Sequence, residues 1–205
     1  MKTLLKRPSP NSEQSINDKF SVKELIEFER FCRDNAQWDE MKKCFADDSR
    51  VTISWFQGTG KEFVDTSSKM NTYAPHKIFN TIVWLKNEKA VSITMATIQT
   101  RGTINGHELE LNSDAKLIYR TQKIDGEWQI ISMDGIYEKD ALVPVSPNAE
   151  ICIPKEEIAK FRSSYAHLTY MLNKGGYTIN SNLPGIDKPE LVDELYEAAD
   201  QWLNQ

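Results

Sequence analysis

Hydrophobic residues recur at helical spacing in the first part of the chain. Ser21 and Glu24 have the spacing of a capping box, and Phe20 and Leu25 have that of a hydrophobic staple. This pattern predicts a helix that begins near Ser21, with a buried stripe of Leu25, Phe28, Phe31 and Cys32. Its charged residues are expected on or near the opposite side: Glu24, Glu27, Arg30 and Arg33. A second short helix is predicted from the spacing of Trp38, Met41 and Phe45.

The hydrophobic period changes from that of a helix to that of a strand after residue 49. Alternating segments predict strands at 50–56, 76–85, 90–101, 108–122 and 128–137. A third short helix is expected around Phe63 and Met70, and Asp125-Gly126 is a hairpin signal. Helices followed by successive antiparallel strands indicate an α+β fold. We therefore expect a curved antiparallel sheet that forms a cone-shaped half-barrel covered by the N-terminal helices.

Two further amphipathic segments follow the predicted sheet. The first ends at Gly175-Gly176 and has one apolar face, formed by Ile158, Phe161, Tyr165, Leu168 and Leu172. The second begins with a capping-box spacing at Asp187 and Glu190 and carries a stripe of Leu191, Leu195, Ala199 and Trp202. Helices without a core of their own must pack on the main domain or on a partner chain. The predicted parts are a flexible N-terminal arm, the cone-shaped domain and a two-helix C-terminal extension, at residues 1–19, 20–145 and 146–205.

Composition and charge argue against several classes of protein. The 205 residues carry a formal net charge of −5, and no block of Lys and Arg could follow a phosphate backbone, so we expect no nucleic-acid partner. No apolar run is long enough to span a membrane, and the first 18 residues lack the apolar core of a secretory signal. The sequence therefore predicts a cytoplasmic protein that does not bind membranes.

Cysteine and histidine are few and widely spaced. Neither the three cysteines nor the three histidines have metal-ligand spacing: Cys32, Cys44, Cys152, His76, His107 and His167. The segment "GTGK" at 58–61 lacks the remaining spacing and the Ser or Thr of a phosphate-binding P-loop. We therefore expect reduced thiols, no metal and no organic cofactor.

Three segments in order carry a resemblance to a known family. They are "WDEMKKCFADDSRVTISWFQG", "HKIFNTIVWL" and "KIDGEWQI", at residues 38–58, 76–85 and 123–130. Together they resemble the nuclear transport factor 2-like superfamily, and within it the polyketide cyclase-like (SnoaL-like) branch and scytalone dehydratase. The resemblance covers roughly residues 20–145. It implies a conical cavity that holds a small hydrophobic molecule, and a homodimer formed through the sheet.

The resemblance also implies a pair of site residues. In scytalone dehydratase-like members, an aspartate four residues before the tryptophan of the second helix orients a histidine on the cavity wall. The matching residues are Asp34, which precedes Trp38, and His76, which opens a strand. A carboxylate bonded to one ring nitrogen fixes the tautomer and raises the basicity of the other nitrogen. The alternatives are a helix-break aspartate on the surface and a strand-start histidine bonded only to backbone.

The chain departs from the dehydratase pattern at two positions. The second histidine of that pattern is replaced by Arg101, which can hold an anion but cannot exchange the catalytic proton. The tyrosine of the first strand is replaced by Ile53. A surface position beside the following turn remains an alternative for Arg101. Both departures weaken the inference of a dehydration mechanism.

Strand alternation predicts the walls of the cavity. Regular strands would place these residues on the inner face: Ile53, Trp55, Asn80, Trp84, Met95, Thr97, Arg101 and Leu117. One hypothesis is a lyase or isomerase in which His76 moves a proton, Asp34 orients it, and Arg101 or Asn80 holds the oxyanion. A second is a non-catalytic domain for small-molecule binding or assembly. An epoxide hydrolase-like site is the third, and the least supported because Arg101 has no neighbouring strand carboxylate.

Overall fold

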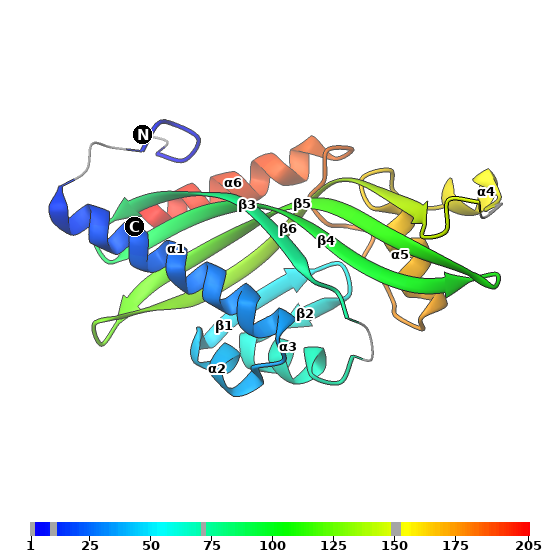
Figure 1. Cartoon of the computed structure of the whole chain (residues 1–205). Coiled ribbons are helices and arrows are strands. Elements are labelled where there is room, and N and C mark those ends of the chain that lie inside the picture. The colour runs from blue at the N-terminus through cyan, green and yellow to red at the C-terminus, as the bar shows by residue number, and fades with distance from the viewer. Residues whose placement is uncertain (1–2, 9–11, 71–72, 149–152) are drawn as a thin grey trace.

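The computed structural model describes residues 3–8, 12–70, 73–148 and 153–205. Its helices are α1 Glu13–Asp34, α2 Trp38–Lys43, α3 Gly60–Ser67, α4 Lys155–Ile158, α5 Ala166–Lys174 and α6 Pro189–Asn204. Its strands are β1 Phe45–Ile53, β2 Phe56–Gly58, β3 His76–Lys86, β4 Lys89–Ile104, β5 His107–Ile124 and β6 Glu127–Pro144. They form one curved sheet, and the predicted α+β class is confirmed (Figure 1).

The sheet has the strand order β2-β1-β6-β5-β4-β3. Strands β3 to β6 are consecutive antiparallel neighbours joined by tight turns, whereas β1 pairs with β6 in parallel. The hairpin predicted at Asp125-Gly126 is present, and both residues have positive φ. Long strands and short turns explain why alternation along the sequence located this sheet well.

The two faces of the sheet are covered by different parts of the chain. In Figure 1, α1 crosses one face near α2 and α3, while α6 lies along the other face. The α1 side holds the core of the predicted cone, which includes Val22, Ile26, Met41, Phe63 and Tyr119. The α6 side buries a second cluster of Trp84, Val91, Ile93, Ile118, Ile136, Ala199 and Leu203. Dimerisation through the sheet stays a prediction, and α6 covers part of the face it would use.

Helix α1 differs from its prediction in both its start and its rotation. It begins at Glu13, because Ser12 caps it and exchanges hydrogen bonds with Ser15 in a capping box. The buried residues include Val22, Ile26 and Cys32, so the predicted stripe is wrong for its phenylalanines. Phe28 and Phe31 stack on each other, and they and Phe20 are exposed to solvent.

The described residues at the start of the chain are attached to α6 and to the sheet. The backbone N–H groups of Thr3 and Leu4 both donate to Oδ1 of Asp200, at 2.6 and 2.7 Å. The Leu4 side chain is buried, and the indole of Trp84 donates to the carbonyl of Lys6 at 2.7 Å. These contacts, with the early start of α1, contradict the predicted arm over the described part of 1–19.

The described residues of the C-terminal extension form three helices where two were predicted. Residues 159–165 break the first amphipathic segment into α4 and α5. Asp187 does not cap α6, whose N-cap is Lys188; it accepts instead from Arg162, and from Ser164 at 2.7 Å. Its ion pair with Arg162 joins the two halves of the extension. No helix in the described part of the chain is long and apolar enough to cross a bilayer.

Candidate functional site

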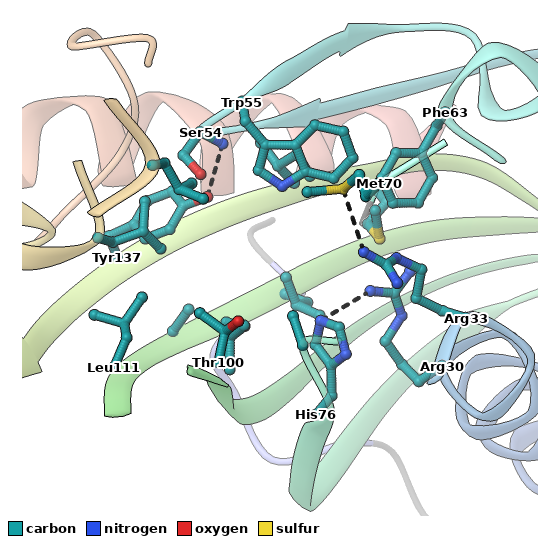
Figure 2. Close-up of a pocket in the computed structure, with 18 residues that line it drawn as sticks. Arg30, Arg33, Ser54, Trp55, Phe63, Met70, His76, Thr100, Leu111 and Tyr137 are labelled. Atoms are coloured by element: carbon teal, nitrogen blue, oxygen red, sulfur yellow. Dashed lines mark hydrogen bonds between the residues drawn. The ribbon is translucent and has the colours of Figure 1, made fainter. Parts of the chain in front are cut away.

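A largely apolar cavity lies between α1, the inner face of the sheet and α5 (Figure 2). The cavity has a volume of about 80 Å³. One water needs roughly 10–15 Å³, so there is room for a small ligand. The residues that line it are Arg30, Arg33, Ile53, Ser54, Trp55, Phe63, Met70, Ala74, His76, Ile98, Thr100, Leu111, Ala115, Leu117, Met133, Tyr137, Leu168 and Leu172.

Asp34 and His76 meet at the edge of this cavity. The ring Nδ1 of His76 lies 2.7 Å from Oδ1 of Asp34, and the backbone N–H of His76 donates to Oδ2 at 2.7 Å. Asp34 is the last residue of α1 and His76 the first of β3, so the contact joins two elements 42 residues apart. The histidine lines the cavity while the aspartate lies behind it. The structure therefore shows the contact that the resemblance implied.

The hydrogen bonds define the protonation state of the pair. Hydrogen bonds from His76 and the charge of Arg30 outweigh the effect of burial, so the pKa of Asp34 lies below its usual value. An ionised carboxylate only accepts, and Nδ1 of His76 must therefore carry the proton. At the other ring nitrogen, Nε2, the Nη1 of Arg30 lies 3.4 Å away (Figure 2). Because arginine only donates, Nε2 is unprotonated in this arrangement, and its electron pair faces the Arg30 N–H.

Burial and neighbouring positive charge decide the basicity of His76. Burial lowers its pKa most, Arg30 and Arg33 lower it further, and the hydrogen bond and charge of Asp34 oppose them. The net shift is downward, whereas the expectation from the sequence was a raised basicity. The imidazole is therefore neutral at neutral pH. The contact with Asp34 was expected from the resemblance, but the two arginines beside His76 were not.

Glu29 and Arg30 form a buried pair next to His76 that was not predicted from the sequence. Both Nε and Nη2 of Arg30 bond to the Glu29 carboxylate, the former at 2.5 Å. The Tyr119 hydroxyl donates to the same carboxylate at 3.4 Å. Glu29 has no exposed surface, and Arg30 is 4% exposed. The predicted rotation of α1 placed its charged residues toward solvent. Their burial could have been predicted, because Glu29 and Arg30 follow Val22 and Ile26 at helical spacing.

Only part of the predicted cavity wall is in place. Ile53, Trp55 and Leu117 line the cavity with His76. The five remaining predicted residues do not: Asn80, Trp84, Met95, Thr97 and Arg101. On β4, Ile98 and Thr100 face the cavity, so the expected face of this strand was inverted. A shift of one residue reverses every side chain of a strand, which explains why several residues fail together.

A register shift in β3 explains why its two predicted wall residues, Asn80 and Trp84, do not face the cavity. His76 pairs with Ile98 and Ile78 with Ala96, but the register shifts before Thr81 pairs with Thr94. Such an irregularity changes which parity of residue faces inward. Asn80 lies within the shifted segment and is exposed. The expected wall depended on unbroken alternation from residue 76 to 85, which the shift interrupts.

The other misplaced residues have partners outside the cavity. Trp84 is buried in the cluster under α6, and Met95 is exposed. Thr97 donates to Asp114 at 2.6 Å across β4 and β5. The Arg101 side chain is 58% exposed and pairs with Glu110 at 2.9 Å, so the surface alternative is correct for it. Neither Arg101 nor Asn80 is placed to hold an oxyanion beside His76.

Three residues with hydroxyl groups also line the cavity: Ser54, Thr100 and Tyr137. Tyr137 on β6 accepts from the backbone N–H of Ser54 at 2.8 Å, and burial raises its pKa to about 12. Thr100 donates to the carbonyl of Tyr73 at 3.1 Å. Figure 2 shows Tyr137 and Ser54 at the end away from the arginines. The resemblance implied a tyrosine at the position of Ile53 on the first strand. Tyr137, from another strand, places its phenol beside Ser54, the residue that follows Ile53.

The C-terminal extension completes the cavity. Leu168 and Leu172 of α5 line it, and α5 is fixed to β6 by Asp140. This aspartate accepts from Nδ1 of His167 at 2.8 Å and from the backbone N–H of Leu168 at 2.7 Å. His167 itself is absent from the lining. The extension is therefore part of the site and not an independent appendage.

The sequence matches known proteins over most of its length. A family model described as a SnoaL-like domain matches residues 14–134. Pea pathogenicity protein 2 of Fusarium vanettenii is 24% identical over 199 residues, covering 91% of this chain and 85% of that protein. An uncharacterized protein of Emericella nidulans is 25% identical over 207 residues, covering 92% of this chain and 87% of the relative.

Solved structures share the fold at low sequence identity. A scytalone dehydratase candidate from Novosphingobium aromaticivorans has a TM-score of 0.54 and 13% identity, covering 68% of this chain and 99% of that one. A hexachlorocyclohexane dehydrochlorinase (LinA-type3) from Novosphingobium barchaimii has a TM-score of 0.54 and 14% identity, covering 68% and 97%. These likenesses confirm the expected nuclear transport factor 2-like fold.

Proposed function

Because the chain belongs to the SnoaL-like domain family, we propose that it is a lyase or isomerase of the dehydratase type that acts on a small carbonyl compound. The observation that carries this proposal is the Asp34–His76 contact at the edge of a largely apolar cavity. A neutral imidazole with its Nδ1–H held by a carboxylate is a competent general base through Nε2. Structural neighbours named as a dehydratase candidate and a dehydrochlorinase support the same reaction class.

The proposed step is removal of a proton next to a carbonyl group. Nε2 of His76 takes the proton, and the electron pair of the broken C–H bond forms the enolate. Arg30, 3.4 Å from Nε2, holds the enolate oxygen. In a β-hydroxy ketone the enolate then expels hydroxide as the C–O bond breaks, and the hydroxide takes the proton from Nε2 of His76 to leave as water, which restores the neutral imidazole. In an isomerase the proton returns at another carbon instead.

Proton exchange in heavy water tests this proposal even while the natural substrate is unidentified. A panel of β-hydroxy ketones and cyclic ketones would be incubated with the protein and followed by NMR. We expect deuterium incorporation next to the carbonyl, or loss of water, with the wild type and not with His76→Gln. His167→Gln is the matched control, since it also loses an aspartate-bonded imidazole but lies outside the cavity lining. Full turnover by folded His76→Gln would contradict the proposal.

A non-catalytic ligand-binding domain is the second candidate. The observation that favours it is the Arg30 Nη1 next to Nε2, because this donor occupies the electron pair that a base needs. In this case Arg30 and His76 would both serve as hydrogen-bonding groups for a bound ligand. The two candidates differ in outcome: the binding domain gives saturable binding with no exchange of substrate protons.

A further inference from the structure

Arg33 is a second arginine of the cavity, and its surroundings differ from those of Arg30. It lies in the last turn of α1, is 8% exposed and lines the cavity. Among the described residues, its one hydrogen-bond partner is the thioether of Met70, 3.6 Å from Nη2. Its guanidinium also lies 5.8 Å from the ring of Trp38. Neither neighbour carries a negative charge.

The nearby carboxylates are occupied by other groups. Glu29 is bonded to two nitrogens of Arg30, and both oxygens of Asp34 accept from His76. Within the part of the chain that the structure describes, no ion pair of Arg33 is found. A guanidinium buried without an anion is costly, and arginine does not lose its proton to escape that cost. The charge of Arg33 is thus available to an anion in the cavity.

The rest of the cavity sets the shape of such a ligand. Its far walls are mostly apolar, with Leu111, Leu117 and Met133 on the sheet and Leu168 and Leu172 on α5. Figure 2 shows both arginines together at one end, near Met70, Phe63 and His76. An apolar chamber with charge at one end suits an amphipathic molecule of small size.

We propose that this site binds a small monocarboxylic acid, with its carboxylate on Arg33 and its apolar body among the leucines. The planar fork of a guanidinium matches a carboxylate, which it can bind through two parallel hydrogen bonds. One positive charge without an ion-pair partner favours a monoanion. A phosphate dianion would need a second free cation, and Arg30 is already paired with Glu29.

This inference rests on the proposed function for the identity of the site, and it narrows the substrate class to carboxylic acids. A carboxylate on Arg33 would direct the adjacent part of the ligand toward His76, which lines the same end of the cavity. Binding and proton transfer remain separable, because a carboxylate that cannot react still binds Arg33. Failure of one can therefore be told from failure of the other.

Benzoate and benzamide provide the test, because they have nearly the same shape and differ in charge. Their dissociation constants would be measured by NMR titration of the labelled full-length protein. We expect benzoate to bind about tenfold or more tightly than benzamide. Arg33→Gln should remove this preference, and Arg33→Lys should keep part of it. Arg101→Gln is the matched control, since that arginine is exposed and outside the cavity lining.

The outcomes decide the proposal without dependence on turnover. Equal binding of benzoate and benzamide to the wild type, or no binding of benzoate at millimolar concentration, overturns it. An unchanged preference in folded Arg33→Gln also overturns it. If Arg33→Gln fails to fold, the wild-type comparison and Arg33→Lys still decide. Selective benzoate binding without proton exchange on any ketone would support this site and contradict the proposed lyase or isomerase.

Discussion

Asp140 holds His167 in the same two-point arrangement in which Asp34 holds His76. In each case one carboxylate oxygen accepts from the ring Nδ1, and the other accepts from a backbone N–H at 2.7 Å. The two pairs differ in their surroundings. The His76 side chain is 9% exposed and lines the cavity beside Arg30, whereas that of His167 is 33% exposed. The Asp140–His167 pair therefore serves as an internal control for a catalytic role of the Asp34–His76 pair.

Removal of each imidazole should have separate effects. We expect His76→Gln to lower turnover by about 10²–10⁴-fold, the usual contribution of a general base. His167→Gln should leave turnover within a few-fold of the wild type and should loosen the attachment of α5. Steady-state kinetics on the substrate identified by proton exchange, with thermal unfolding of each variant, would check this. Equal losses of activity in the two variants would show that the effect is structural.

The pH dependence of kcat/KM should show that the pKa of His76 lies below the ordinary value of histidine. The base must be neutral, so activity is lost as pH falls through its pKa. Burial and the arginine charges lower that pKa, so the acid limb should lie below pH 6.5, the value for an unperturbed histidine. Asp34→Asn removes an interaction that raises the pKa, and the limb should then move further toward acid. A limb above 6.5 in the wild type would contradict this description of the site.

The Arg162–Asp187 pair should stabilise the C-terminal extension in a pH-dependent way. Despite the opposing effect of burial, hydrogen bonds from Arg162 and Ser164 lower the pKa of Asp187 to about 2, from 3.8. The depressed pKa means that its contribution is fully present above 3.8 and is lost as pH falls toward 2. Asp187→Asn should cost about 1–3 kcal/mol at neutral pH, as expected for a lost charged hydrogen bond.

Urea unfolding at neutral pH and near pH 2 would measure this contribution. The difference between the wild type and Asp187→Asn should shrink at the lower pH. Asp47→Asn serves as the control, because Asp47 forms an exposed pair with Lys61 and such pairs contribute little. A difference that persists unchanged near pH 2 would assign the loss to packing and not to charge.

Ala36 is held in a strained backbone conformation at the end of α1. Its φ is +55°, the left-handed region that usually takes glycine after a helix. Its side chain is exposed, so replacement should lose no packing. Ala36→Gly should stabilise the fold by about 0.5 kcal/mol, the relief of strain less the extra freedom of the unfolded chain. Ala36→Val should destabilise it, and thermal unfolding of both variants would test the opposite signs.

Local sequence patterns determined most of the architecture. Alternating hydrophobic residues and short turns between consecutive strands located β3 to β6, because each hairpin depends on residues close in sequence. The family resemblance then brought Asp34 and His76 together, although 42 residues separate them. The Asp187–Glu190 spacing was misleading, because Asp187 found a stronger partner in Arg162, which no local pattern reveals.

Tertiary structure decided most of the cavity lining beyond Ile53, Trp55, His76 and Leu117. The expected rotation of α1 followed its phenylalanines, but packing against the sheet buried Glu29, Arg30 and Arg33 instead. Glu29 and Arg30 pair with each other, and Tyr119 and His76, from distant strands, add contacts to this pair that no local pattern reveals. Likewise, a register shift in β3 exists only relative to β4. The sequence by itself therefore determined the long strands β3 to β6 and the Asp34–His76 contact, while the fold decided most of the cavity wall, the burial of the arginines and the closure by α5.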